Sequence, residues 1–387
     1  MSIIVSTGDK NMSEILEQTA KAQTTQSEKN KKQIRTLNEK ITEFKDKITG
    51  LVTECNQVYL TTHMSPDYDA IASLGALGLI CKKLKKAPYI IVDQKDYDSL
   101  PQDRAEMFDK LKEKFVIINK QDFENNKVEN SLLIMVDVNK GFMTPMKNNY
   151  KDFSNIIVID HHLEDENTIK TKNKLILKEV SSCSEIMYWL LKKYKIKSSD
   201  PIYYTYLLTG IALDTDKGNK NVYASTESCR GELKINGADD MVVSSYFSLD
   251  FEQDRKIQKL IDETIWKTFR YGIIVGNKEE YTKEEIAKAA DYLLKYTCEA
   301  AIVCARNKDG SYDVSARSNK GDVDIAFLMH ELNNGGGNFN SASCPAIFVD
   351  ADDLDLQKEI LIKRIYDIIY HRNHQTKRKR YKVVSRK

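Results

Sequence analysis

The sequence lacks several features that mark common classes of protein. Its seven cysteines form no Cys-x-x-Cys pair and their number is odd, which argues against a disulfide framework or a zinc site built from cysteines. No stretch approaches the roughly 20 apolar residues that span a bilayer. The first residues, MSIIVSTGDKNMSE, have neither the basic start nor the long apolar middle of a secretory signal. Together these absences predict a cytoplasmic protein without a membrane span.

An excess of one charge is also missing. The chain has 59 Lys and Arg against 57 Asp and Glu, a net charge of +2. Proteins of long nucleic acids usually carry a basic excess and a broad basic groove with stacking aromatics, so we expect no such partner. Only the end of the chain, KRKRYKVVSRK at 377–387, is strongly basic. It is either a solvated end or a contact for RNA, lipid headgroups or an acidic partner.

The first region, residues 1–54, combines a polar segment with an amphipathic helix. Residues 1–30 have few apolar side chains, and we expect them to be disordered or weakly helical. Apolar residues then recur at alternating intervals of three and four from Ile34 to Leu51. This heptad spacing predicts a helix that either dimerises the protein or packs on its own domain.

The rest of the chain alternates strands with helices. Continuous apolar runs such as SLLIMVDV and NIIVIDH, separated by helical patterns, predict a mostly parallel α/β sheet with helices on both faces over residues 55–250. A connecting helix at 251–269 leads to a smaller α/β domain at 270–355. A helix and basic tail at 356–387 close the chain.

Acidic and histidine side chains follow successive apolar runs of the first domain. They are His63, Asp67, Asp69, Asp137, Asp160, His161, His162 and Asp214. The carboxyl ends of parallel strands meet at one edge of a sheet, where ligands bind, so we expect these groups to lie together. So many carboxylates require a compensating cation.

The residue types point to particular metals. Imidazole and carboxylate ligands without thiolates suit Mn²⁺ first, with Mg²⁺, Fe²⁺ or Zn²⁺ as alternatives. The number of ligands predicts two divalent ions that share a bridging carboxylate. Such a pair generates a hydroxide nucleophile for in-line displacement at phosphorus.

The combination of HMSPDYDA, VDVN, DHH and TGIALDT resembles the DHH superfamily of phosphoesterases. VSARS and the glycine run GGGNFNSAS at 335–343 are similar to the C-terminal domain of that family, and the resemblance covers roughly residues 55–350. It implies that one metal is held by His63 and Asp67, and the other by Asp69, His161 and Asp214. Asp137 would bridge the two ions.

The same resemblance implies roles for the other two residues of the DHH motif. Asp160 would orient an imidazole, as metal-bound histidines usually require. His162 would contact the scissile phosphate or help to protonate the leaving oxygen.

Two further stretches, NGADDMVVSSYFSLDFEQDRKIQKLI and the segment from Ala289 to the glycines, resemble bacterial GdpP-type cyclic-di-AMP phosphodiesterases. This implies nucleotide-signalling chemistry, the hydrolysis of cyclic di-AMP to pApA by the two-metal mechanism, and a homodimer. The expected substrate-binding residues are Arg317, Ser318, Gly335, Gly336, Gly337 and Asn338.

One difference from the family leaves more than one substrate possible. Asn338 stands where the family has a histidine, and asparagine carries no charge and donates no proton in catalysis at neutral pH. The alternative is an oligoribonuclease or pAp phosphatase that acts on pApA, short RNA or pAp. A third reading is a non-catalytic regulator that binds nucleotides.

Overall fold

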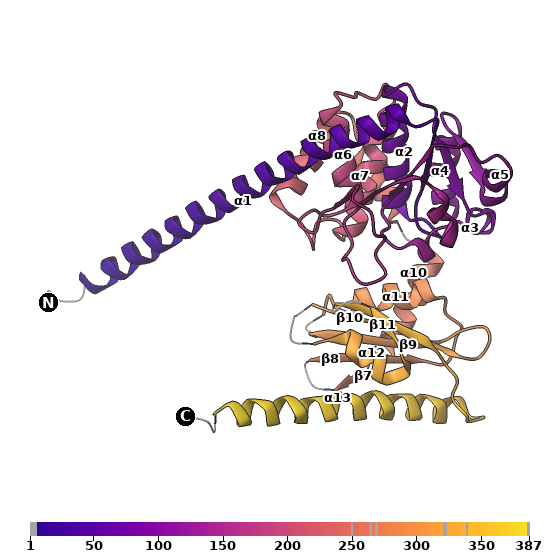
Figure 1. Cartoon of the computed structure of the whole chain (residues 1–387). Coiled ribbons are helices and arrows are strands. Elements are labelled where there is room, and N and C mark those ends of the chain that lie inside the picture. Colours follow the sequence, from indigo (N-terminus) through magenta and orange to yellow (C-terminus); the bar gives the residue numbers. More distant parts are fainter. Residues whose placement is uncertain are drawn as a thin grey trace. The chain divides into compact units, whose positions relative to one another are not determined.

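The computed structural model describes residues 6–384 except 249–250, 264, 268–269, 297, 320–322 and 338–339. The chain divides into two compact units, residues 1–248 and 249–387 (Figure 1). All seven cysteines are free and buried, as expected for a protein without a disulfide framework. Among the described residues, no helix has both the length and the apolar character needed to cross a bilayer.

The first unit is built on a six-stranded sheet in which every neighbouring pair is parallel. The strand order is β3-β2-β1-β4-β5-β6. The strands are β1 (Gln57–Thr61), β2 (Tyr89–Val92), β3 (Val116–Asn119), β4 (Ser131–Val136), β5 (Asn155–Asp160) and β6 (Lys174–Ile176).

Helices surround this sheet. They are α1 (Ser6–Glu54), α2 (Tyr68–Lys83), α3 (Gln94–Asp98), α4 (Gln102–Lys112), α5 (Lys120–Asn125), α6 (Cys183–Lys193), α7 (Ile202–Asp214), α8 (Ala224–Ile235) and α9 (Asp240–Tyr246). Two short 3₁₀ helices, η1 (Gly141–Met143) and η2 (Lys147–Asp152), follow β4.

Successive side chains of a strand point to opposite sides, and in the central strand β4 both sides are buried. In β4, Leu132 and Ile134 enter the core beneath α1, α2, α6 and α7, whereas Leu133 and Met135 enter the core that contains Phe123 of α5. The prediction of a mostly parallel sheet with helices on both faces is confirmed. Apolar residues with no polar alternation are what this double burial requires.

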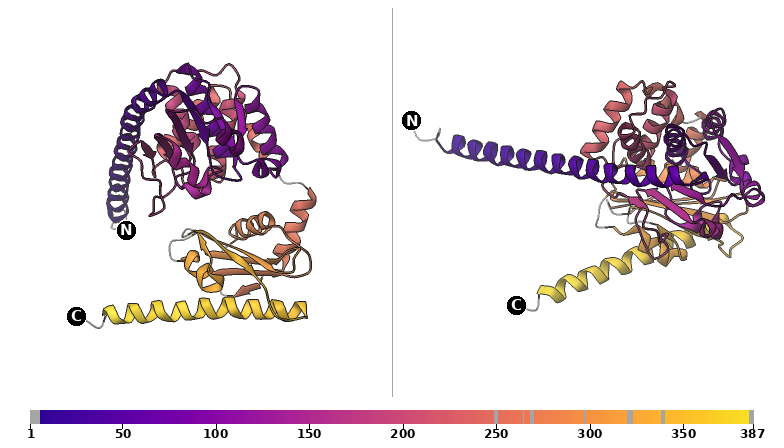
Figure 2. Two further views of the ribbon diagram at one scale, coloured as in Figure 1. Left: turned by 45° about the vertical axis from the view of Figure 1, so that its right-hand side comes forward. Right: turned by 45° about the horizontal axis from the view of Figure 1, so that its top comes forward.

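Helix α1 contains the residues with heptad spacing and packs on its own unit. Its apolar stripe, from Leu37 to Val52, is buried in the core of its own unit, where α1 packs on α6 and α8. Figure 2 shows α1 running along this helical layer and extending beyond it toward the N-terminus. The helix begins at Ser6, so the segment before Ile34, expected to be disordered or weakly helical, is helical in the structure.

The second unit is a smaller α/β domain with a mixed sheet in the order β11-β12-β10-β9-β8-β7. The strands are β7 (Ile265–Lys267), β8 (Tyr271–Gly276), β9 (Ala300–Arg306), β10 (Tyr312–Ser318), β11 (Gly336–Gly337) and β12 (Ser341–Ile347). Its helices are α10 (Phe251–Asp262), α11 (Lys283–Leu293), α12 (Ile325–Asn333) and α13 (Leu354–Val384). Helices α10 and α11 share a core on one face, and α12 and α13 share a core on the other.

One helix boundary differs from the expectation. The helix predicted over 251–269 ends at Asp262, and Ile265–Lys267 instead forms the edge strand β7, antiparallel to β8. The apolar residues Ile265 and Trp266 continue the pattern of the helix, but pairing with β8 satisfies their backbone groups in an extended conformation. Tertiary pairing therefore overrides the local pattern at this point.

Candidate metal centre

The centre lies where the winding of the parallel sheet reverses. β1 and β4 are neighbours in the middle of the sheet, and the chain winds outward from them in both directions. Ligands of such sheets bind beyond the carboxyl ends of the strands at this switch point. The register pairs Thr61 with Met135, so His63 and Asp137, each two residues further on, emerge side by side. The loop after β5 adds His161 and His162 at the same edge.

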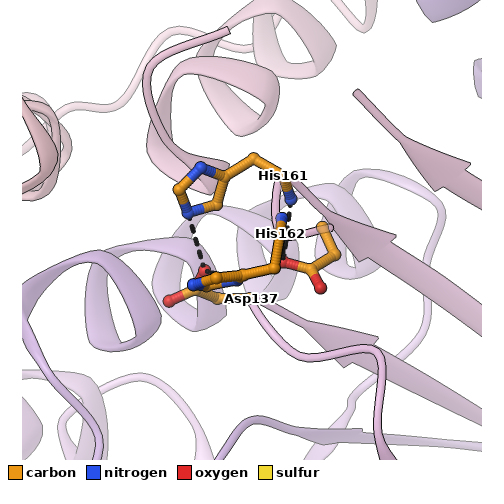
Figure 3. A group of neighbouring side chains, drawn as sticks. Asp137, His161 and His162 are labelled. Carbon is orange, nitrogen blue, oxygen red and sulfur yellow. Dashed lines mark hydrogen bonds and ion pairs between the residues drawn. The ribbon is translucent and has the colours of Figure 1, made fainter. Parts of the chain in front are cut away.

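Asp137 presents one oxygen to each of two groups of ligands. Its Oδ2 lies 3.6 Å from His63 Nε2, which is 3.9 Å from Asp67 Oδ1. Its Oδ1 lies 3.5 Å from His161 Nε2. Figure 3 shows Asp137 together with His161 and His162.

The second group forms around His161. The Nε2 atom of His161 lies 3.8 Å from Asp69 Oδ2 and 3.5 Å from Asp214 Oδ2. In each group of three ligands, the potential ligand atoms lie within 4.8 Å of one another. The structure thus brings together all six residues that the sequence analysis proposed as metal ligands.

The chemistry of these atoms fits a divalent cation. Asp137 Oδ1, His161 Nε2 and Asp214 Oδ2 are buried and have no hydrogen-bond partner among the described residues. Buried polar atoms are normally hydrogen-bonded. Separations of 3.5–3.9 Å are long for hydrogen bonds, but they approach the spacing of two ligands that each lie about 2.1 Å from one ion.

Without metal, protons supply the missing positive charge. Burial alone would lower the pKa of His63 and His161, but the carboxylates of Asp137 and its neighbours outweigh it and raise these pKa values to about 11 and about 10. Burial and the charge of Asp137 raise the pKa of Asp69 to about 7. Burial and Asp69 likewise raise the pKa of Asp214 well above its ordinary value. The cluster therefore requires cations, whether protons or metal.

The backbone at Asp137 turns out of the sheet in a left-handed conformation, with φ of 56°. Aspartate and asparagine adopt this conformation more readily than other residues with a Cβ. The Asp137 N–H still donates to the carbonyl of Ile159, over 2.9 Å, so the turn stays attached to β5. Despite burial, His161 and His63 hold the pKa of Asp137 below its ordinary value, so its carboxyl is ionised.

Backbone N–H groups hold the two aspartates of the first motif. Asp67 caps α2 and accepts a hydrogen bond from the Ala70 N–H over 3.0 Å. Asp69 is completely buried and accepts from the N–H groups of Cys183, over 2.8 Å, and Ser184, over 2.6 Å. These N–H groups belong to the first turn of α6, which favours a negative charge.

Asp160 contacts the imidazole ring of His162, whereas it contacts His161 through the backbone N–H. Its Oδ1 accepts from the backbone N–H groups of His161 and His162, over 2.8 and 3.2 Å, and lies 2.8 Å from His162 Nδ1. Asp160 is fully buried, whereas the His162 side chain is 57% exposed. Burial lowers the pKa of His162, but Asp160 outweighs it and the net shift is upward. His162 is therefore an accessible imidazole beside the cluster, and its contact with Asp160 favours the protonated form.

The expected substrate-binding residues of the second unit gather around the end of β10. Arg317 pairs with Ser341 across β10 and β12, and the Ser318 N–H donates to the Asn340 carbonyl. Gly336 and Gly337 pair with β12 beside them. Asn338 lies outside the described residues.

The contacts of these side chains limit what they offer a ligand. Arg317 Nε donates to Asp291 Oδ1 over 2.9 Å, and the Ser318 hydroxyl donates to the Val323 carbonyl. A Cβ atom on Gly335 or Gly337 would lie 2.4 Å from a backbone oxygen of β12. The glycines therefore permit close packing of two backbones within this unit.

Sequence reasoning missed the residues that surround the ligands. The first turn of α6 holds Asp69, and Gly210 of α7 gives it room: a Cβ there would lie 2.9 Å from Asp69 Cα and 2.3 Å from Ser184 Oγ. Gly210 stands in the quoted motif TGIALDT, which was the available signal. The contact itself joins residues far apart in the chain, and no local spacing encodes it.

Two family models match the chain. The family model described as the DHH family, N-terminal domain, matches residues 57–211, and that of the DHHA1 domain matches residues 270–348. Together the two matches cover more than half of the chain.

Two curated relatives are cyclic-di-AMP phosphodiesterases, GdpP of Bacillus subtilis (28% identical over 305 residues) and PdeA of Listeria monocytogenes (26% over 301 residues). Each alignment covers 76% of this chain and 45% of the relative, so the chain spans less than half of their length. A crystal structure of an exopolyphosphatase-related protein from Bacteroides fragilis shares the fold, with a TM-score of 0.68 at 19% identity. That match covers 84% of this chain and 97% of the other.

Proposed function

The chain belongs to the DHH family, and from this premise we propose that it is a metal-dependent phosphodiesterase that opens cyclic di-AMP to the linear dinucleotide pApA. The observation that carries the proposal is the position of Asp137, whose two oxygens face two separate groups of ligands. The substrate is suggested by the relatives from Bacillus subtilis and Listeria monocytogenes, which are named for cyclic di-AMP.

One divalent ion would be held by His63, Asp67 and Asp137, and a second by Asp69, His161 and Asp214, with Asp137 shared between them. Nitrogen and carboxylate ligands without thiolates favour Mn²⁺, with Mg²⁺, Fe²⁺ or Zn²⁺ as alternatives. Ions bound there supply Lewis acidity and lower the pKa of the attacking water.

The protein side chains outside the ligand set then act on the phosphate. His162 is exposed, and Asp160 both orients its ring and raises its pKa. A protonated imidazole in this place binds a phosphate oxygen or gives a proton to the leaving ribose oxygen. Asp160, which is buried and accepts from two backbone N–H groups, fixes the ring that does this.

A second substrate class has one observation in its favour. Asn338 replaces the histidine that the family resemblance leads one to expect, and an uncharged side chain offers less to a phosphate. An oligoribonuclease or pAp phosphatase acting on pApA, short RNA or pAp would use the same metal cluster. The two classes differ in the phosphate ester that is bound and cleaved, which is a phosphodiester in cyclic di-AMP, pApA and RNA and a phosphomonoester in pAp.

Asp137→Asn tests the central assignment. Asparagine tolerates the left-handed backbone at this position, so the fold should be retained. The substitution replaces one carboxylate oxygen, a metal ligand, by an amide nitrogen that does not bind metal. We expect turnover of cyclic di-AMP to fall at least about 100-fold, because loss of even an outer partner of a metal ligand costs 10–100-fold. Asp152→Asn, at a half-exposed aspartate paired with Lys127, is the control and should retain full activity. Undiminished turnover in Asp137→Asn would refute the metal assignment.

A further inference from the structure

Three exposed apolar side chains lie on the loops beside the charged cluster. The large hydrophobic residues exposed in the described part of the first unit are Val116, Val128, Phe142, Met143, Leu163, Val222, Ile235 and Met241. Three of these eight lie on the two loops that follow β4 and β5: Phe142 is 56% exposed, Met143 42% and Leu163 67%. We call these three residues the rim patch. Isolated exposed hydrophobics are ordinary, but a group on the loops of a polar site is not.

Hydrogen bonds fix the rim patch against the metal-binding loops. Leu163 directly follows His162. The Met143 carbonyl accepts from the Met64 N–H over 2.7 Å, and Met64 directly follows His63. The side-chain amide of Asn139 donates to the His162 carbonyl over 3.4 Å. The loops after β1, β4 and β5 are thus linked, and the rim patch borders the cluster.

The loops that carry the rim patch are held in place by further contacts. The Ile169 N–H donates to the Asn139 carbonyl over 2.8 Å, and Lys140 pairs with Asp165 across the two loops. Met143 and Thr144 close the turn of η1 through bonds to Lys140 and Gly141. The exposed Phe142 ring therefore lies on a loop that is held in place by hydrogen bonds and an ion pair.

We propose that the rim patch is a nucleobase-binding subsite in which the ring of Phe142 stacks on a purine face. The proposal rests on the proposed function, since the cluster would anchor the phosphate of the same nucleotide. A base is joined to its phosphate through one ribose, so a base bound next to the cluster reaches side chains on the adjoining loops. Its flat face matches an exposed aromatic ring, and methionine and leucine side chains adapt to its edge.

The subsite gives the reaction a preference for bases that stack well. Stacking on an aromatic ring tolerates any base because each has a π face, and it is strongest for purines. Phe142 therefore contributes affinity for a purine dinucleotide without a hydrogen-bond readout. Met143 and Leu163 exclude water around the stacked base.

The test uses equilibrium binding of a probe that reports stacking directly. The probe is a linear dinucleotide of the fluorescent purine 2-aminopurine with a phosphorothioate link that resists hydrolysis, titrated in Mg²⁺. Stacking quenches its emission. Wild-type protein should bind and quench it, Phe142→Ala should bind it about tenfold more weakly or worse and quench less, and Phe142→Tyr should restore both.

Two controls separate a base contact from a general effect. Val116→Ala removes an equally exposed apolar side chain (56%) at the start of β3, on the opposite edge of the sheet, and should bind as the wild type does. Inhibition by inorganic phosphate, which has no base, should be the same in Phe142→Ala and wild type. A matching loss of phosphate affinity would overturn the proposal, because Phe142 would then act on the cluster itself.

The remaining outcomes distinguish a failure of the nucleobase subsite from a failure of the proposed phosphodiesterase function. If Phe142→Ala binds and quenches the probe like wild type while cyclic di-AMP is turned over, the subsite is wrong and the proposed function stands. If wild type quenches the probe in a Phe142-dependent manner but hydrolyses no dinucleotide, the proposed function is wrong and the subsite stands. A lower molar mass of Phe142→Ala in light scattering would assign the rim patch to contact between two copies of the chain and overturn the proposal.

Discussion

At the scale of single residues, protons and metal ions compete for the same atoms. His63 and His161, with pKa values of about 11 and about 10, are protonated at neutral pH in the metal-free protein. Asp69, with a pKa of about 7, is partly protonated. A metal ligand must be a neutral imidazole or an ionised carboxylate. Loading the site therefore requires these groups to lose protons that the empty cluster retains.

We accordingly expect Mn²⁺ binding at pH 7 to release more than one proton per chain. The sign follows from the raised pKa values: as pH rises toward them, fewer protons must be displaced, so the apparent metal affinity increases with pH. Calorimetric titration with Mn²⁺ in two buffers of different ionisation enthalpy measures the number released. An equal heat in both buffers, meaning no proton release, would contradict the assignment of these residues as ligands.

The sequence predicted which residues lie in the cluster but not every partner. His63 and Asp137 follow strands, and strand ends can be recognised from local patterns. The left-handed backbone of Asp137 and the contact between Asp160 and His162 depend on one turn and one rotamer. Residue spacing carries no information on either, so the resemblance could say only that Asp160 orients an imidazole.

At the scale of elements, the close approach of α7 to α2 and α6 holds the cluster together. Gly210 of α7 lies against Asp69 of α2 and Ser184 of α6. Asp214 stands at the end of the same helix. A shift of α7 would therefore move Asp214 directly and would change the contact that Gly210 makes with Asp69. The strand pattern of the sheet was predictable because it is local. The helix–helix approach that positions Asp69 and Asp214 was not.

Gly210→Ala should therefore reduce both stability and metal binding. The added methyl would require Asp69 or Ser184 to move, at about 1–3 kcal/mol, and Mn²⁺ affinity should fall about 10–100-fold. Gly231→Ala in α8 is the matched control: no atom lies within 4 Å of its Cβ position, so the free energy of unfolding should rise by roughly 0.5–1 kcal/mol. Urea unfolding and Mn²⁺ titration measure the two quantities. Equal behaviour of both variants would refute the role of Gly210.

At the scale of the whole molecule, the chain consists of two units with separate cores. The metal cluster is formed entirely by the first unit, and the residues around the glycine run by the second. The alternation of strands and helices predicted the α/β class and the parallel sheet of the first unit, but not the strands β3, β11 and β12. It could not fix β7, because an edge strand of three residues is decided by its partner β8 and not by its own pattern.

Metal binding should therefore stabilise one unit selectively. At a free Mn²⁺ concentration 100 times the Kd, the first unit gains about 2.7 kcal/mol, because metal binds its folded form only. Hydrogen exchange followed by mass spectrometry should show slower exchange in peptides of β1, β4 and α7, and no change in peptides of β8 and β9. Equal protection of both units would contradict a metal site confined to the first.

The measurement that tests the central claim most directly is a turnover assay with and without Mn²⁺. Cyclic di-AMP, cyclic di-GMP, pApA, pAp and a short RNA are offered at equal concentration, and the products are separated by chromatography. The account predicts preferential conversion of cyclic di-AMP to pApA, abolished by a chelator and restored by Mn²⁺. Turnover that is independent of metal, or cyclic dinucleotides left intact while pApA, pAp or RNA is degraded, would contradict it.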